Sequence, residues 1–276
     1  MFGPIHRLTP ADLPDCVALG LDRRWPREER KWQMLFAVGS VYGVRDDAGD
    51  LAAVVVLTCF DGELAVIGMM VVATRYGRRG LGRALMTHVL AEAGDATVLL
   101  NATEAGRPLY EKLGFEAAGM IYSYAGDFGP APGVPGSRPA TPGDLSEIRA
   151  LDAQANGADR AYLVRRLPGF SEALRVVEHR GAVTGYAGAW RNIDNAVIGP
   201  VIAASPDDAA TLIADVACAV TGPVRVDLGD RHPRLREWVT GRGLALRDSE
   251  TVMVLGGRPL PGDRARWFAP FMQALG

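Results

Sequence analysis

The segment at residues 76–86, YGRRGLGRALM, combines three arginines with three glycines. An apolar run at residues 64–73, LAVIGMMVVA, precedes it, as expected of a buried strand. Leu81, Leu85 and Val89 then recur at helical spacing. The glycines and arginines therefore fall on a connection from a strand to the first turn of a helix.

The chemistry expected of such a connection is anion binding. The first backbone N–H groups of a helix have no partners within the helix, and glycines allow an anion to approach them closely. Arg78, Arg79 and Arg83 lie at the positive end of the helix dipole, where each cation costs up to about 1 kcal/mol unless an anion is bound. These residue types predict a site for a phosphate or a pyrophosphate.

Two common phosphate-binding motifs do not fit this segment. A P-loop requires Gly-Lys-Ser/Thr, and the chain has Gly82, Arg83 and Ala84 instead. A dinucleotide-binding turn requires a small residue three positions after Gly82, where Leu85 stands. A nucleotide-binding domain is therefore a weak alternative for this half of the chain.

The segment resembles the acyl-CoA loop of the GNAT acetyltransferases, which reads Arg/Gln-x-x-Gly-x-Gly/Ala between a strand and a helix. Gly80 and Gly82 match its last two fixed positions, whereas Gly77 stands where the family has Arg or Gln. The stretch at residues 101–121, NATEAGRPLYEKLGFEAAGMI, resembles a second family segment that contains LYEKLGF. Two family motifs in the expected order extend the resemblance over most of residues 7–124.

This resemblance implies a binding site for acetyl-CoA. In the family, the strand before the loop separates from the next strand, and the pantetheine arm lies along the exposed backbone. A main-chain N–H in that gap polarises the thioester carbonyl, an effect worth about 3 kcal/mol by analogy with other acyl-transfer enzymes. The implied acetyl-CoA ligands are Met70, Val71, Val72, Arg78, Arg79, Gly80, Leu81, Gly82, Arg83 and Asn101.

The resemblance also implies that Tyr110 is the general acid, because many family members have a tyrosine near the CoA sulfur at this position. A packing role for this aromatic ring is the alternative. The general base stays open among Asp61, Glu63, Glu104 and a water chain, since the first two also fit a solvated turn. No metal is expected, because the four histidines and three cysteines are scattered without ligand spacing.

Two short matches at nearly equal offsets indicate an internal duplication. RLTPADL at residues 7–13 recurs as RPATPGDL at 138–145, and AVIG at 65–68 recurs at 196–199. Each half repeats the order of capped helix, hairpin, apolar strand, helix, strand and short helix. We predict the α/β class with tandem GNAT domains, each having a mixed, largely antiparallel central sheet flanked by helices. The first domain is expected at residues 1–125 and the second at 140–276, joined by a Gly/Pro-rich linker at 126–139.

The second half is expected to keep the fold but not to bind acyl-CoA. Ser205, Asp207 and Asp208 stand where the first half has arginines, and acids there would repel a pyrophosphate. The arrangement resembles bacterial two-domain acetyltransferases with a degenerate, YitH-type GNAT-like C-terminal domain. The apolar end of the chain, RWFAPFMQALG at 266–276, is predicted to be an internal core strip, with packing across a domain or subunit boundary as the alternative.

Composition sets the remaining expectations. The 276 residues carry a net charge of −2, so there is no overall basic field, and neither nucleic acid nor a membrane is an expected partner. Cys16, Cys59 and Cys218 lie far apart in apolar surroundings, as expected of buried thiols in a reducing compartment. We therefore expect a cytoplasmic protein, with a homodimer left open.

The predicted function is acetyl-CoA-dependent N-acetylation of a primary amine on a small molecule or a peptide, by direct transfer in a ternary complex. The alternative is a non-catalytic acyl-CoA sensor whose second half couples occupancy of the first half to a partner. The motifs do not identify the acceptor, because acceptors are bound by loops that vary freely within a fold.

Overall fold

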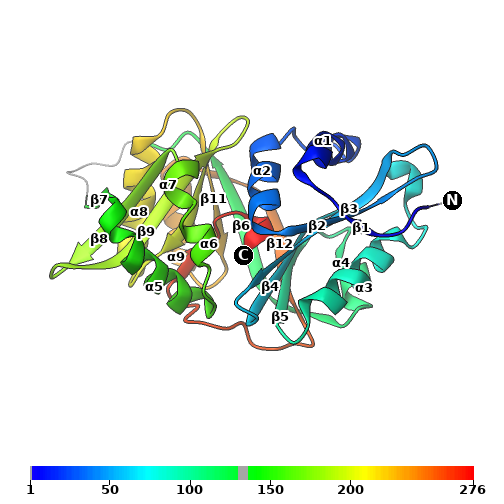
Figure 1. Cartoon of the computed structure of the whole chain (residues 1–276). Coiled ribbons are helices and arrows are strands. Elements are labelled where there is room, and N and C mark those ends of the chain that lie inside the picture. The colour runs from blue at the N-terminus through cyan, green and yellow to red at the C-terminus, as the bar shows by residue number, and fades with distance from the viewer. Residues whose placement is uncertain (1, 130–135) are drawn as a thin grey trace.

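A computed structural model describes residues 2–129 and 136–276. One continuous sheet runs through the molecule, and Figure 1 shows the first half of the chain at one end and the second half at the other. The predicted α/β class with a mixed, mostly antiparallel sheet flanked by helices is confirmed.

The elements of the first half include all those predicted, in the predicted order, with helix α2 and the long strand β6 as the main additions. The second helix, α2, was not predicted, because four of the ten residues in its sequence ERKWQMLFAV are polar and no side chain caps its start. The elements are β1 His6–Arg7, η1 Pro10–Asp12, α1 Leu13–Asp22, α2 Glu29–Val38, β2 Ser40–Arg45, β3 Leu51–Phe60, β4 Leu64–Val72, η2 Thr74–Tyr76, α3 Leu81–Ala93, β5 Thr97–Ala102, α4 Arg107–Glu111 and β6 Phe115–Gly126.

The second half repeats this order and adds a C-terminal strand and 3-10 turn. Two short helices, α6 and α7, take the place of α2. The elements are β7 Arg138–Pro139, η3 Pro142–Asp144, α5 Leu145–Asn156, α6 Ala161–Val164, α7 Leu167–Phe170, β8 Ala173–His179, β9 Ala182–Arg191, β10 Ala196–Ile202, α8 Pro206–Ala219, β11 Val224–Gly229, α9 Pro233–Gly241, β12 Ala245–Leu255, β13 Trp267–Ala269 and η4 Gln273–Leu275.

The two faces of the sheet are covered by different helices. Alternate residues of a strand point to opposite faces, and in β3 Val54 and Val56 join the core under α1 and α2, whereas Val55 and Leu57 join the core under α3. The same alternation in β9 divides its residues between the core under α5 and the core under α8. These five helices therefore bury their apolar residues against the sheet.

The last strand of each half is exchanged. The sheet order is β1-β2-β3-β4-β5-β12-β6-β11-β10-β9-β8-β7, so β12 lies between β5 and β6, and β6 pairs with β11. Figure 1 shows β6 and β12 at the centre of the molecule. The range 1–125 therefore ends in a strand that serves the second half, and the range 140–276 contributes a strand to the first. Within the expected linker at 126–139, residues 130–135 lie outside the described residues.

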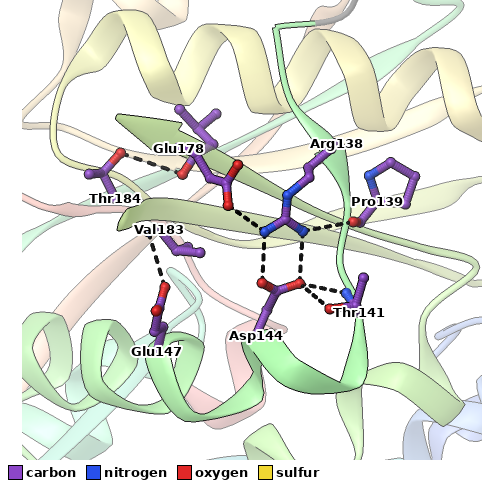
Figure 2. A network of polar contacts seen from close by, with 9 residues as sticks. Arg138, Pro139, Thr141, Asp144, Glu147, Glu178, Val183 and Thr184 are labelled. Atoms are coloured by element: carbon purple, nitrogen blue, oxygen red, sulfur yellow. Dashed lines mark hydrogen bonds and ion pairs between the residues drawn. The ribbon is translucent and has the colours of Figure 1, made fainter. Parts of the chain in front are cut away.

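The duplication is confirmed by matching details at the start of each half. Thr9 and Asp12 form a capping box, and Thr141 and Asp144 form the same box in the second half. Figure 2 shows how Arg138 strengthens the second box: its guanidinium donates two hydrogen bonds of 2.8 Å to Asp144. These bonds hold the pKa of Asp144 well below its usual range.

The C-terminal segment crosses from the second half to the first. β13 pairs with β10, whereas η4 lies against β4. A Cβ atom at Gly199 would lie 2.0 Å from the carbonyl oxygen of Pro270, and one at Gly68 would lie 2.8 Å from Ala274. The glycine that ends both copies of AVIG is thus required for this close passage. The segment is an internal core strip, and it also spans the boundary between the halves.

A buried ion pair holds the end of this segment. Arg160 and Asp152 are each 1% exposed and lie 2.7 Å apart. Arg160 also donates hydrogen bonds to the carbonyl oxygens of Leu275 and Gly276, at 3.3 and 3.0 Å. Removing one partner of such a pair leaves a buried charge uncompensated. The pair holds the guanidinium of Arg160 in place, and its two hydrogen bonds anchor the carbonyl groups at the end of η4.

Two absences concern the described residues only. None of their helices is long and apolar enough to cross a membrane. They also contain no group of three or more His, Cys, Asp or Glu side chains placed to hold a metal ion.

The expected burial of the three cysteines is correct for Cys16 and wrong for the other two. Cys59 and Cys218 are exposed.

A fragment ending at residue 129 tests the strand exchange. It keeps β1–β6 but lacks β12, so the edge of β5 is left without its partner strand. Unpaired strand edges promote association. We expect the fragment to aggregate or to dimerise in size-exclusion chromatography with light scattering. Co-expression with residues 136–276 is expected to restore a soluble 1:1 complex, and a monomeric, cooperatively folded fragment would contradict the exchange.

Candidate active site

The site begins where two parallel strands separate. β4 and β5 pair only from Leu64–Thr97 to Ile67–Leu100, although β4 continues to Val72. A bulge follows in β4, where Met69 has a φ of 50° and the register with β3 shifts. No strand among the described residues pairs with β4 beyond Ile67 on the β5 side. The backbone of Met70, Val71 and Val72 therefore borders an open edge.

The corresponding edge in the second half is closed. β10 and β11 also separate after three paired residues, Ala196–Val224 to Ile198–Val226. There β13 pairs with Val201 and Ile202. When the two copies of AVIG are aligned, these residues correspond to Met70 and Val71 of the first half. Trp267 of β13 packs on Gly229, where a Cβ atom would lie 3.2 Å from the indole ring. The chain itself thus fills the second gap.

The glycine and arginine loop lies at the end of β4, as the sequence predicts. Arg78 and Gly80 both adopt left-handed conformations, with φ of 63° and 84°. Gly80 is the N-cap of α3, and no atom lies within 4 Å of the place where its Cβ would be. Gly82 in the first turn packs near Leu109 of α4, 3.3 Å from a Cβ built there. The start of α3 is therefore open at Gly80 and tight at Gly82.

The arginines of this loop fall into two groups. Arg75 pairs with Asp46 and Asp50 at 2.8 and 2.9 Å, so its charge is compensated. Arg78 and Arg83 are exposed and have no hydrogen bond or ion pair with any described residue. Arg79 lies over the ring of Tyr76 at 5.5 Å and is otherwise unpaired among these residues. Three positive charges at a helix N-terminus are thus left for an anion.

A cavity of about 290 Å³ opens at the separation of β4 and β5. The first half contributes the bulge of β4, the end of β5, the connection before α2, the first turn of α2, and Tyr110 of α4. The second half contributes β11, β12 and η4. Its lining residues are Trp25, Pro26, Glu28, Lys31, Ile67, Gly68, Met69, Met70, Asn101, Thr103, Tyr110, Arg225, Asp248, Glu250, Gln273 and Ala274.

Tyr110 lines this cavity although its ring is mostly buried, with 8% exposed. Its ring meets Phe115 edge-on at 6.1 Å. Burial, with a further contribution from Glu250, raises the pKa of Tyr110 to about 12. The hydroxyl is therefore protonated at neutral pH and can act only as a proton donor there.

Two groups of predicted residues lie apart from this chemistry. Asp61 and Glu63 are exposed at the start of β4, at the end opposite the cavity, and Glu104 is exposed without lining it. Asn101 lines the cavity, but its amide N–H donates to the carbonyl oxygen of Gln273 at 2.8 Å. Leu81 is 7% exposed and packs in the core, so only its backbone can face a ligand.

Sequence reasoning missed the charged groups of the cavity. Glu28, Lys31, Arg225, Asp248 and Glu250 come from α2 or its N-terminus and from the second half. The only signal in the sequence is the alternation of Asp248 and Glu250, which places two acids on the same face of one strand. Nothing in the sequence connects that face with the first half.

Comparison with known proteins gives matches in both halves. A family described as an acetyltransferase (GNAT) domain matches residues 38–117, and a second family with the same description matches residues 148–269. The uncharacterised N-acetyltransferase YitH of Bacillus subtilis is 30% identical over 258 residues, which cover 91% of each chain.

Solved structures show the same architecture over the full length. A candidate acetyltransferase from Pyrococcus horikoshii superimposes with a TM-score of 0.85 at 21% identity, covering 99% of this chain and 95% of the other. A GCN5-related N-acetyltransferase from Sphaerobacter thermophilus gives 0.66 at 20% identity, covering 95% and 97%. A tandem GNAT protein of the clavulanic acid biosynthesis pathway gives 0.65 at 16% identity, covering 94% and 99%. With the duplicated sheet and both family matches, these findings show that the chain belongs to the GNAT acetyltransferase family and carries two GNAT domains in tandem.

Proposed function

We propose that this protein transfers an acetyl group from acetyl-CoA to a primary amine, and that the first half alone binds acetyl-CoA. The observation that carries the proposal is the open edge of β4, which joins an uncompensated cationic helix start to a cavity lined by Tyr110. Acetyl-CoA would supply the acetyl group as an activated thioester. The remaining chemistry belongs to residues of the chain.

The residues at the start of α3 fit a diphosphate. Backbone N–H groups there are unpaired by the nature of a helix start, and Gly80 leaves open space beside them. Arg78, Arg79 and Arg83 add positive charge without carboxylate partners among the described residues. The second half offers Ser205, Asp207 and Asp208 instead, where Ser205 already accepts the N–H of Asp208. An anion would be repelled there.

The open edge of β4 fits an extended arm with amide groups. Backbone N–H and C=O groups of Met70, Val71 and Val72 would take such an arm as a sheet takes an added strand. In the second half β13 occupies the equivalent edge, so an arm would have to displace a strand. A main-chain N–H near the bulge at Met69 would polarise the acetyl carbonyl, a contribution of about 3 kcal/mol in other acyl-transfer sites.

Tyr110 would protonate the leaving thiolate. Its hydroxyl holds its proton at neutral pH, and it lines the same cavity as Met69 and Met70. Because a phenol of such high pKa is a weak acid, the proton moves only as negative charge develops on the sulfur. The amine enters from the side of the cavity that α2 and the second half line. A non-catalytic sensor would use the same cofactor site but would release no thiol.

Replacing Gly80 by Ala tests the cofactor loop. A side chain at a φ of 84° adds about 1–2 kcal/mol of backbone strain. The loop can relieve this strain by changing its backbone conformation, and its N–H groups would then no longer point toward the anion. We expect the dissociation constant of acetyl-CoA, measured by calorimetry, to rise about fivefold to thirtyfold. Gly94→Ala is the control, because Gly94 has a φ of 60° and open surroundings at the other end of the same helix. Equal affinity in both variants would refute the role of this loop.

Replacing Tyr110 by Phe tests the general acid and the enzyme class together. We expect kcat for acceptor-dependent thiol release to fall about 100-fold or more, because a positioned acid contributes that much. The affinity for acetyl-CoA should hardly change. Tyr124→Phe is the control, since Tyr124 is also buried but packs in the core of the second half. Unchanged turnover would remove Tyr110 from the mechanism, and tight binding without thiol release in the unaltered protein would favour the sensor.

A further inference from the structure

We propose that Glu250, which the second half contributes on its exchanged strand, takes the proton from the acceptor amine in the first-half site. This proposal rests on the proposed acetyl transfer and supplies the general base that the sequence left open. The proposal makes the site in the first half dependent on a residue of the second half.

The register of the sheet places Glu250 at the site. β12 pairs with β5 from Val254–Leu99 to Thr251–Ala102, and Ala102 is the last residue of β5. Glu250 is the next residue of β12, one step beyond the end of β5, while its other neighbour is Ile121 of β6. Its side chain lines the cavity that Tyr110 and the bulge of β4 also line. An exchanged strand thus carries a carboxylate to the separation of β4 and β5.

The other charged groups around the cavity have an ion-pair or hydrogen-bond partner. Lys31 of α2 pairs with Glu28 at 2.6 Å, and Glu28 also accepts a hydrogen bond of 3.0 Å from Asn192. Arg225 of β11 pairs with Asp227 of the same strand at 2.8 Å. Asp248 accepts the backbone N–H of Ser249 and is exposed.

Glu250 alone has no such partner. Its carboxylate makes no hydrogen bond or ion pair with any described residue, although it lines the cavity. A half-buried carboxylate without a partner is costly, and a stable fold keeps such groups mainly where a ligand uses them. An ammonium group entering the cavity would compensate it.

The environment of Glu250 suits a base that works near neutrality. Burial raises the pKa of Glu250 to about 7, and the carboxylates of Asp227 and Asp248 add to this, while Arg225 and Lys31 oppose it. Of the other titratable groups that line the cavity, Glu28 is paired with Lys31, and Tyr110 stays neutral in this range. A base with a pKa near the working pH both accepts and releases a proton readily.

The second half provides an internal comparison. In the first half, the last residue of β5, Ala102, pairs with Thr251 of the exchanged strand β12. In the second half, the last residue of β11, Gly229, pairs with Ile121 of the exchanged strand β6. The residue before Ile121 is Met120, which is therefore equivalent to Glu250. The half whose gap is filled by β13 thus has a thioether at this position, and the half with the open gap has a carboxylate.

The protons balance in the following way. An alkylammonium acceptor gives one proton to the carboxylate of Glu250 and becomes a neutral amine, and Glu250 later returns this proton to solvent. The nitrogen then forms a bond to the acetyl carbon as the bond from that carbon to sulfur breaks. Tyr110 protonates the sulfur, and the second proton from nitrogen restores the hydroxyl of Tyr110. The products are an amide, a thiol and one free proton.

The test compares Glu250→Gln with Glu104→Gln in the full-length protein. Glu104 is a matched control because it is an exposed glutamate that follows β5 without lining the cavity. Thiol release would be followed from pH 5.5 to 9 with acetyl-CoA and n-butylamine, spermidine or the peptide Ala-Gly-Ala as acceptor. Calorimetry would give the acetyl-CoA affinity, and ¹³C NMR of glutamate carboxyls, without acetyl-CoA, would give their titration.

We expect kcat/KM of the unaltered protein to fall about tenfold per pH unit below pH 7, because the protonated carboxyl cannot act as a base. Glu250→Gln should lower kcat/KM at pH 8 about 100-fold or more, remove this acidic limb and leave the acetyl-CoA affinity unchanged. It should also remove a glutamate resonance that titrates near pH 7, and Glu104→Gln should change none of these.

Two results would overturn the proposal and leave acetyl transfer intact: an active Glu250→Gln variant with the original pH profile, or a spectrum in which no glutamate titrates near pH 7. An unaltered protein that binds acetyl-CoA but releases no thiol with any of the three amines would instead contradict the proposed function, and the role of Glu250 with it.

Discussion

The separation of β4 from β5 beyond Ile67 is the constraint on which the rest of this structure depends. Two parallel strands that stop pairing leave backbone groups without partners, and such groups are costly when buried. The second half satisfies the equivalent groups with β13, whereas the first half leaves its edge beside a cavity and a cationic loop. The same fold thus yields one closed and one open gap.

Because the last strands are exchanged, each half depends on the other for a complete sheet. β12 completes the sheet of the first half, and β6 completes that of the second, so neither half has a finished sheet of its own. The C-terminal segment strengthens this dependence, because it passes Gly199 in one half and Gly68 in the other. The second half contributes strand β12, one wall of the cavity and the carboxylate of Glu250 to the first half.

Local sequence patterns predicted the features that depend only on neighbouring residues. The capped helix at the start of each half, the apolar strands and the glycine at the start of α3 each follow from residue type and spacing. All were found where expected, with Thr9 and Thr141 capping a 3-10 turn that leads into the helix. Helix α2 was missed because its apolar face is interrupted by polar residues. Strands β6 and β12 were not among the predicted elements, and their pairing could not be predicted, since either strand could add to the edge of β5. Glu250 was missed for the same reason, because its place in the site depends entirely on that pairing.

The most direct test of this account is a crystal structure of the protein grown with coenzyme A. The account predicts one ligand per chain, with its diphosphate at the backbone N–H groups of residues 78–83 and its pantetheine arm along Met70–Val72, and with β13 still paired to β10. A ligand seated at residues 203–208, or one that displaces β13 from the second gap, would contradict it.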